Sequence, residues 1–106
     1  MKAVNLRTEH LVDPIGIDIR TPYLSWNCEE GKKQTAYEIE AVSDGKVVWN
    51  SGKKESDEMH TTFGKEAESR QNISWKVRLW DENGKEGEWS KEGVFELAIL
   101  EKNQFV

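Results

Sequence analysis

The chain lacks the features that would place it in several protein classes. Cys28 is the one cysteine among 106 residues, so no disulfide can form within the chain. No apolar stretch has the length of a signal peptide or a membrane span, so no membrane partner is expected. If Met1 is the natural start of the protein, these absences predict a cytoplasmic location.

Positive charge is outnumbered by negative charge. The formal net charge is -5, and the 15 lysines and arginines form no long run. Nucleic-acid binding needs a basic patch, so nucleic acid is not an expected partner. Mean hydropathy is low at -0.80. Five Trp, three Phe and two Tyr nevertheless argue against disorder, because disordered chains contain few large aromatic residues.

Short runs of alternating apolar and polar residues dominate the sequence, and no apolar stripe of helical period has a useful length. The clearest run is "NISWKVRLW", and an Asn-Gly turn after it signals a hairpin. Other runs that end at turn-forming residues are "AVNLRTEHLV", "PYLSWN", "QTAYEIEAVS", "VVWNSG", "HTTF" and "GVFELAIL". We therefore predict one all-β domain over residues 1–106, an antiparallel β-sandwich of about seven strands.

Alternation also selects the side chains that should fill the space between the two sheets. In the last run it places Phe95, Leu97 and Ile99 in one row. Because each aromatic ring buries about 150–250 Å², a few rings can fill a small core. The residues predicted to form the structural core are Trp26, Tyr37, Ile39, Trp75, Val77, Leu79 and Phe95.

The order of these runs resembles the immunoglobulin-like sandwich of fibronectin type III domains. A core Trp lies on the second strand, a Tyr-x-Ile pattern on the third, and a long sixth strand leads into the Asn-Gly turn. One position departs from that pattern. The family usually has a tyrosine where this chain has Ile73, and its hydroxyl ties the strand to the preceding loop. We expect this domain to hold the loop by packing instead.

Four motifs follow one another along the chain: Asp13-Pro14-Ile15-Gly16-Ile17-Asp18, Gln34-Thr35-Ala36-Tyr37, Trp49-Asn50-Ser51-Gly52 and Trp75-Lys76-Val77-Arg78-Leu79-Trp80-Asp81-Glu82-Asn83-Gly84. In this order they resemble the N-terminal domain of bacterial α-L-rhamnosidases. The resemblance implies an N-terminal fragment of a larger multidomain glycoside hydrolase that cuts terminal α-L-rhamnosyl linkages. In that family the catalytic acids lie downstream in a separate α-helical barrel, so no catalytic residue is assigned here. The tail "FELAILEKNQFV" resembles the family's exit toward a further β-domain.

Glu38 and Glu40 are the one pair that suggests catalysis. Two residues apart on a strand, their side chains lie roughly 6.5–7 Å apart, close to the separation in inverting glycosidases. A glycosidase also needs an acid with a raised pKa in a cleft, and an open sheet face does not desolvate a carboxylate. In a fibronectin-like sandwich the third and sixth strands are neighbours. We therefore expect these glutamates to face Lys76 and Arg78, each pair contributing about 0.2–1 kcal/mol.

Three tryptophans remain outside the predicted core. Trp80 lies on the opposite strand face from Trp75, beside Arg78, while Trp49 and Trp89 fall at strand ends. An exposed tryptophan can stack on a sugar or anchor a neighbouring domain. We interpret Trp80, Trp89 and Trp49 as contacts to a neighbouring domain, with sugar contact and local packing as the alternatives.

The remaining candidate residues predict no chemistry. His10 and His60 are far apart, with no cysteine or carboxylate at ligand spacing, so no metal site is expected. Cys28 should be a half-buried thiol, and no base lies near it in the sequence to make it a nucleophile. Asn72-Ile73-Ser74 matches a glycosylation sequon by chance. The charged run "KKESDE" is expected to be a solvated loop.

Three interpretations of function follow, none of which needs a cofactor. The chain is an accessory domain that braces or shapes the catalytic barrel of a rhamnosidase, a stand-alone module that binds rhamnose-containing glycans, or a fibronectin-type interaction module. An accessory domain, whose partners are the neighbouring domains of its enzyme, should expose an apolar patch rimmed by polar groups. A glycan-binding module should instead present an aromatic platform beside hydrogen-bonding side chains.

Overall fold

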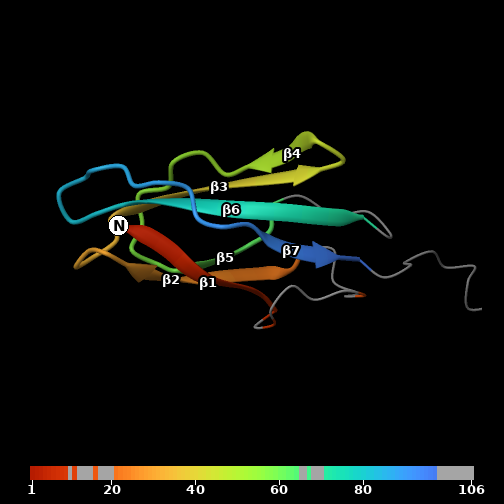
Figure 1. The fold of residues 1–106 in the computed structure, drawn as a ribbon, viewed down its shortest axis with the longest axis horizontal. Coiled ribbons are helices and arrows are strands. Elements are labelled where there is room, and N and C mark those ends of the chain that lie inside the picture. The colour runs from red at the N-terminus through yellow and green to blue at the C-terminus, as the bar shows by residue number, and fades with distance from the viewer. Residues whose placement is uncertain (10, 12–15, 17–20, 65–66, 68–70, 98–106) are drawn as a thin grey trace, which may run out of the picture.

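The chain folds into two packed antiparallel sheets in a computed structural model that describes residues 1–9, 11, 16, 21–64, 67 and 71–97. The strands are β1 (Lys2–Thr8), β2 (Tyr23–Glu29), β3 (Ala36–Ser43), β4 (Lys46–Asn50), β5 (His60–Thr62), β6 (Asn72–Trp80) and β7 (Gly93–Glu96). One sheet has the order β1-β2-β5 and the other β4-β3-β6-β7 (Figure 1). The predicted seven-stranded sandwich is confirmed.

His10, Ile99 and all of the Asp13–Asp18 motif except Gly16 lie outside the described residues. Within the described part of the chain, no helix is long and apolar enough to cross a membrane.

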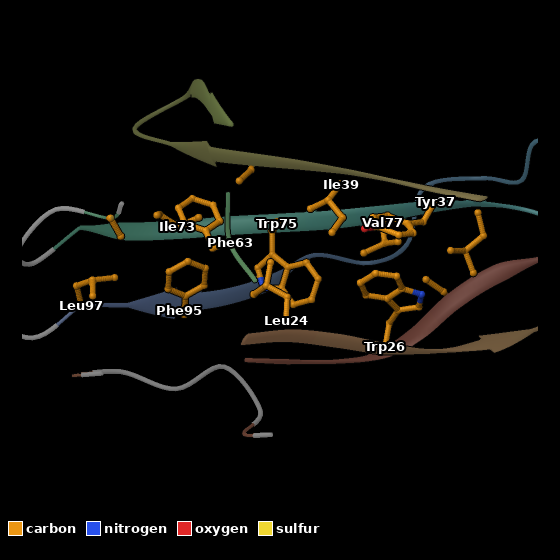
Figure 2. Packing of buried hydrophobic residues seen from close by; sticks show 14 residues of the cluster. Leu24, Trp26, Tyr37, Ile39, Phe63, Ile73, Trp75, Val77, Phe95 and Leu97 are labelled. Atoms are coloured by element: carbon orange, nitrogen blue, oxygen red, sulfur yellow. The ribbon is translucent and has the colours of Figure 1, made fainter. Parts of the chain in front are cut away.

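Strict alternation on β3 and β6 forms the core. Tyr37, Ile39 and Ala41 point inward on β3, while the glutamates between them face outward. The inward-facing residues of β6 are the direct cross-strand partners of these β3 residues. Figure 2 shows side chains of both strands filling the space between the sheets. All seven predicted core residues are at most 8% exposed: Trp26, Tyr37, Ile39, Trp75, Val77, Leu79 and Phe95.

Aromatic edge-to-face contacts link the two sheets. The rings of Trp26 on β2 and Tyr37 on β3 have centroids 5.1 Å apart. At the other side of the sandwich Trp49, on edge strand β4, packs its ring against Phe63, which follows edge strand β5. Phe63 in turn contacts Phe95 on β7 at 5.5 Å. Trp49 therefore helps to close the sandwich, and its ring is partly buried against the core.

Turn residues fix the two hairpins of the larger sheet. Asp44 and Gly45 both have positive φ, 53° and 76°, as a two-residue hairpin between β3 and β4 requires. After the predicted Asn-Gly turn the chain returns along β6, but residues 86–92 form an irregular ladder rather than a strand. Gly87 and Ser90 donate backbone hydrogen bonds to Leu79 and Val77, and regular pairing begins only at β7.

Ile73 occupies the position of the missing corner tyrosine. Its side chain is fully buried in the core, so it contributes packing where the fibronectin pattern has a hydroxyl.

Candidate functional site

Charged side chains form paired rows on the outer face of the four-stranded sheet. The register places Glu38 opposite Arg78 and Glu40 opposite Lys76. The carboxylate of Glu38 lies 2.5 Å from the Arg78 guanidinium, and that of Glu40 lies 3.9 Å from the Lys76 ammonium. Glu86, on the return segment, binds a second nitrogen of Arg78 at 2.6 Å. The predicted charge pairing is confirmed.

Two tryptophans lie among these charges and form a cation–aromatic stack, which consists of Lys53, Trp80, Arg78, Trp89 and Lys76. Lys53 and Arg78 lie over the Trp80 ring, 4.9 and 5.5 Å from its centroid. Arg78 and Lys76 lie over the Trp89 ring at 4.4 and 4.9 Å. The expectation of an exposed Trp80 is corrected by this geometry, because the side chain is only 9% exposed.

The stack leaves little aromatic surface for a sugar. Each cation over an indole ring contributes about 0.5–1 kcal/mol at an exposed site. A sugar that stacked on Trp80 would have to displace Lys53 or Arg78 from that ring. Trp89 is half-buried and carries two cations of its own, and Trp49 packs on the core. The three candidate tryptophans are therefore not brought together into one exposed platform.

The arrangement also lacks the elements of an acid–base catalyst. The Glu38 and Glu40 side chains are partly covered, at 16% and 26% exposed, but each carboxylate is held in an ion pair with Arg78 or Lys76. An acid catalyst instead needs a carboxyl group that is directed into a cleft. His60 stacks on Tyr23, with ring centroids 5.5 Å apart. Among the residues that the structure describes, no three His, Cys, Asp or Glu side chains gather as a metal site would require.

Gln34 has a central position that the sequence argument missed. Its side chain is 3% exposed, and its Oε1 accepts a hydrogen bond of 3.0 Å from Trp26 Nε1. Its Nε2 donates to the backbone carbonyls of Ser56 and Glu58, at 3.0 and 2.8 Å. One buried amide therefore ties the core tryptophan of β2 to residues 53–59, which form most of the connection between β4 and β5. That connection is mainly exposed, as predicted.

Other motif residues also bind the backbone of this domain. The Thr35 hydroxyl donates to the Asp81 carbonyl at 2.8 Å, at the end of β6. Ser51 Oγ accepts from the Ile39 backbone N–H at 2.9 Å, where β4 ends beside β3. Outside the motifs, Ser90 Oγ likewise accepts from the Val77 N–H at 3.0 Å. The motif side chains thus satisfy main-chain groups at strand ends and edges.

Cys28 is a half-buried thiol, as expected. Its Sγ lies 3.5 Å from Gln34 Oε1 and 3.4 Å from Met59 Sδ. Burial raises the pKa of the Cys28 thiol above its ordinary value. Because the thiolate is the reactive form, this environment makes the cysteine less reactive at neutral pH.

Together, the fold and these contacts define an immunoglobulin- or fibronectin-like β-sandwich whose motif residues maintain its own architecture. Over residues 3–101 the chain matches the family described as "Rha78A-like, N-terminal immunoglobulin domain", and it belongs to that family. The resemblance to the N-terminal domain of α-L-rhamnosidases is confirmed.

Curated relatives and solved structures agree with this assignment. The chain is 34% identical over 107 residues to an α-L-rhamnosidase of Formosa agariphila, covering 88% of this chain and 11% of the relative. A structure of α-L-rhamnosidase from Dictyoglumus thermophilum superposes with a TM-score of 0.85 and 31% identity, over 97% of this chain and 13% of that one. The Streptomyces avermitilis α-L-rhamnosidase complexed with L-rhamnose gives a TM-score of 0.86 and 28% identity, over 97% and 11%.

The match to each whole relative is short. The chain spans only about 11% of the length of the curated relatives that it matches. A Fn3-like protein from Clostridium thermocellum, at 18% identity and a TM-score of 0.63, shares the fold.

Proposed function

We propose that the chain is a non-catalytic accessory domain of an α-L-rhamnosidase, and that it braces or shapes the catalytic part of the same enzyme. The enzyme would hydrolyse terminal α-L-rhamnosyl linkages, and the partners of this domain would be its neighbouring domains. A cytoplasmic location stays a prediction.

One observation carries this proposal: the polar motif residues are committed to the domain's own backbone. Gln34, Thr35 and Ser51 each bind main-chain groups of this domain. A catalytic or ligand-binding motif would instead direct its polar atoms into a cleft. Motifs that serve folding are what a supporting domain requires, since its contribution is a rigid shape.

The first test is enzymatic. The purified chain is incubated with a nitrophenyl α-L-rhamnoside, and no hydrolysis above that of a boiled control is expected. Removal of this domain from the rhamnosidase that carries it should lower the thermal stability of the remaining enzyme. Hydrolysis by the chain alone, or an enzyme unaffected by the removal, would contradict the proposal.

The second test addresses glycan binding. Rhamnose and rhamnose-containing glycans are titrated into the chain while tryptophan fluorescence is recorded, and no saturable change is expected because cations cover the Trp80 and Trp89 rings. Saturable quenching that is lost in a Trp89→Ala variant would favour a carbohydrate-binding module instead.

A further inference from the structure

An uncharged row of side chains crosses the outer face of the four-stranded sheet. It consists of Val47 on β4, Val42 on β3, Ser74 on β6 and Val94 on β7, and we call it the valine row. Successive members are direct cross-strand partners in the register of the sheet. The row therefore runs without interruption from one edge of the sheet to the other.

The valine row differs from the rest of this face. The next rows along the sheet contain the ion pairs of Glu40 with Lys76 and of Glu38 with Arg78. Val47 is 59% exposed, one of the few large apolar side chains on the described surface. Val42 and Val94 are half-buried on the same outer face. Three β-branched apolar side chains beside a row of ion pairs have the composition of a small interaction surface.

The place of the valine row indicates what would cover it. The row lies at the end of the sandwich where β7 leads out of the domain, beside the turn between β3 and β4 (Figure 1). Val94 precedes Leu97, the last described residue, by three positions. Residues 98–106, even if fully extended, span at most roughly 30 Å. Any domain attached beyond residue 106 is therefore tethered within reach of this row.

We propose that the valine row is the docking surface for the domain that follows residue 106 in the enzyme, an inference that rests on the proposed function. The docked surface would be apolar and uncharged, because the row offers no charge to pair. The paired ions beside it would form the polar rim of the contact. A buried apolar centre with a polar rim is the usual anatomy of a specific interface.

The test uses the rhamnosidase that carries this domain, with Val47→Lys as the variant and Thr62→Lys as its matched control. Both positions are exposed and β-branched, and each lies on an edge strand, β4 or β5. Proteolytic cleavage between this domain and the next should be at least about tenfold faster with Val47→Lys, because burial of an unpaired ammonium opposes docking. Thr62→Lys should leave the rate unchanged, and neither substitution should alter the Tm of the 106-residue chain by itself.

The outcomes separate this inference from the proposed function. If removal of the whole domain destabilises the enzyme but Val47→Lys acts no differently from Thr62→Lys, the docking surface is wrong and the accessory role stands. If removal of the whole domain has no effect on the stability of the enzyme, both the docking surface and the accessory role are wrong. A 106-residue chain that dimerises until Val47 is replaced would make a second copy the occupant and would overturn the inference. So would hydrogen-exchange protection of β4 that disappears when the chain is shortened after Leu97.

Discussion

Replacement of Gln34 with methionine would remove both hydrogen-bonding ends of a buried side chain while keeping its length and most of its volume. In the wild-type chain the Gln34 amide accepts from Trp26 Nε1 and donates to the carbonyls of Ser56 and Glu58. The variant therefore tests whether one polar group in the core connects β2 to the β4–β5 connection. We expect a folded but clearly less stable protein.

The magnitude follows from where each freed group lies. Trp26 is 2% exposed, so its indole N–H would lose its acceptor in the core, at a cost of about 1–3 kcal/mol. Ser56 and Glu58 belong to a mainly exposed segment, so water can replace the amide, and each lost bond costs about 0.5–1.5 kcal/mol. The free energy of unfolding should fall by about 2–6 kcal/mol, a large share of the 5–15 kcal/mol typical of a domain.

Urea unfolding, followed by tryptophan fluorescence, measures this loss. The control is a double-mutant cycle with Trp26→Phe, which removes the indole donor, so that the double variant contains no orphaned N–H. The cavity created by Trp26→Phe occurs on both arms of the cycle and cancels. We expect a coupling of at least about 1 kcal/mol between the two sites. If the two losses add to within about 0.5 kcal/mol, the hydrogen bond does not stabilise the fold as argued.

Three further predictions address other parts of the domain. Gly87→Ala places a methyl group against the Met1 carbonyl, so urea unfolding should show a loss of about 1–3 kcal/mol; an unchanged stability would mean that the N-terminal residue is not held there. The Lys85 and Asn83 N–H groups lower the pKa of Asp81, so its stabilising effect is present above the unfolded pKa of about 3.9 and is lost as pH falls through the lower folded pKa. In Asp81→Ala, unfolding midpoints should depend less on pH in that acid range, and an identical pH profile would argue against this role. Iodoacetamide should modify Cys28 more slowly in the folded chain than in urea at the same pH, because burial raises the thiol pKa, and equal rates would contradict this.

The strand faces and the charge pairs could be predicted because they depend on period two and on strand order. Once β3 and β6 are neighbours, alternation alone sends Glu38 and Glu40 to the same side as Arg78 and Lys76. The core row of Ile39 follows from the same periodicity. The strand faces are local in the sequence, so a short window is enough to predict them. The charge pairs also need the strand order, which the resemblance to fibronectin type III domains implied.

The state of Trp80 and the position of Gln34 could not be predicted in this way. Trp80 is covered in part by Lys53, which comes from a connection distant in sequence, and no alternation rule reports that contact. Gln34 binds the backbone carbonyls of Ser56 and Glu58. Because every residue type has a backbone carbonyl, the amino-acid sequence does not indicate which residues act as acceptors. Contacts between a side chain and distant main chain become visible only with coordinates.

The hydrogen bonds from Gln34 to residues 53–59 should affect substitutions in that segment differently from insertions and deletions. Because the amide recognises main-chain oxygens, the side chain at position 58 can be exchanged without altering the hydrogen bonds of Gln34. The Ser56 hydroxyl is more constrained, because it accepts from the Glu58 N–H at 3.1 Å within the same turn. An insertion or deletion, by contrast, would carry both oxygens out of reach. Related domains should therefore vary in the residue types of this segment but keep its number of residues. A charge or a label can be introduced here by substitution, without an insertion.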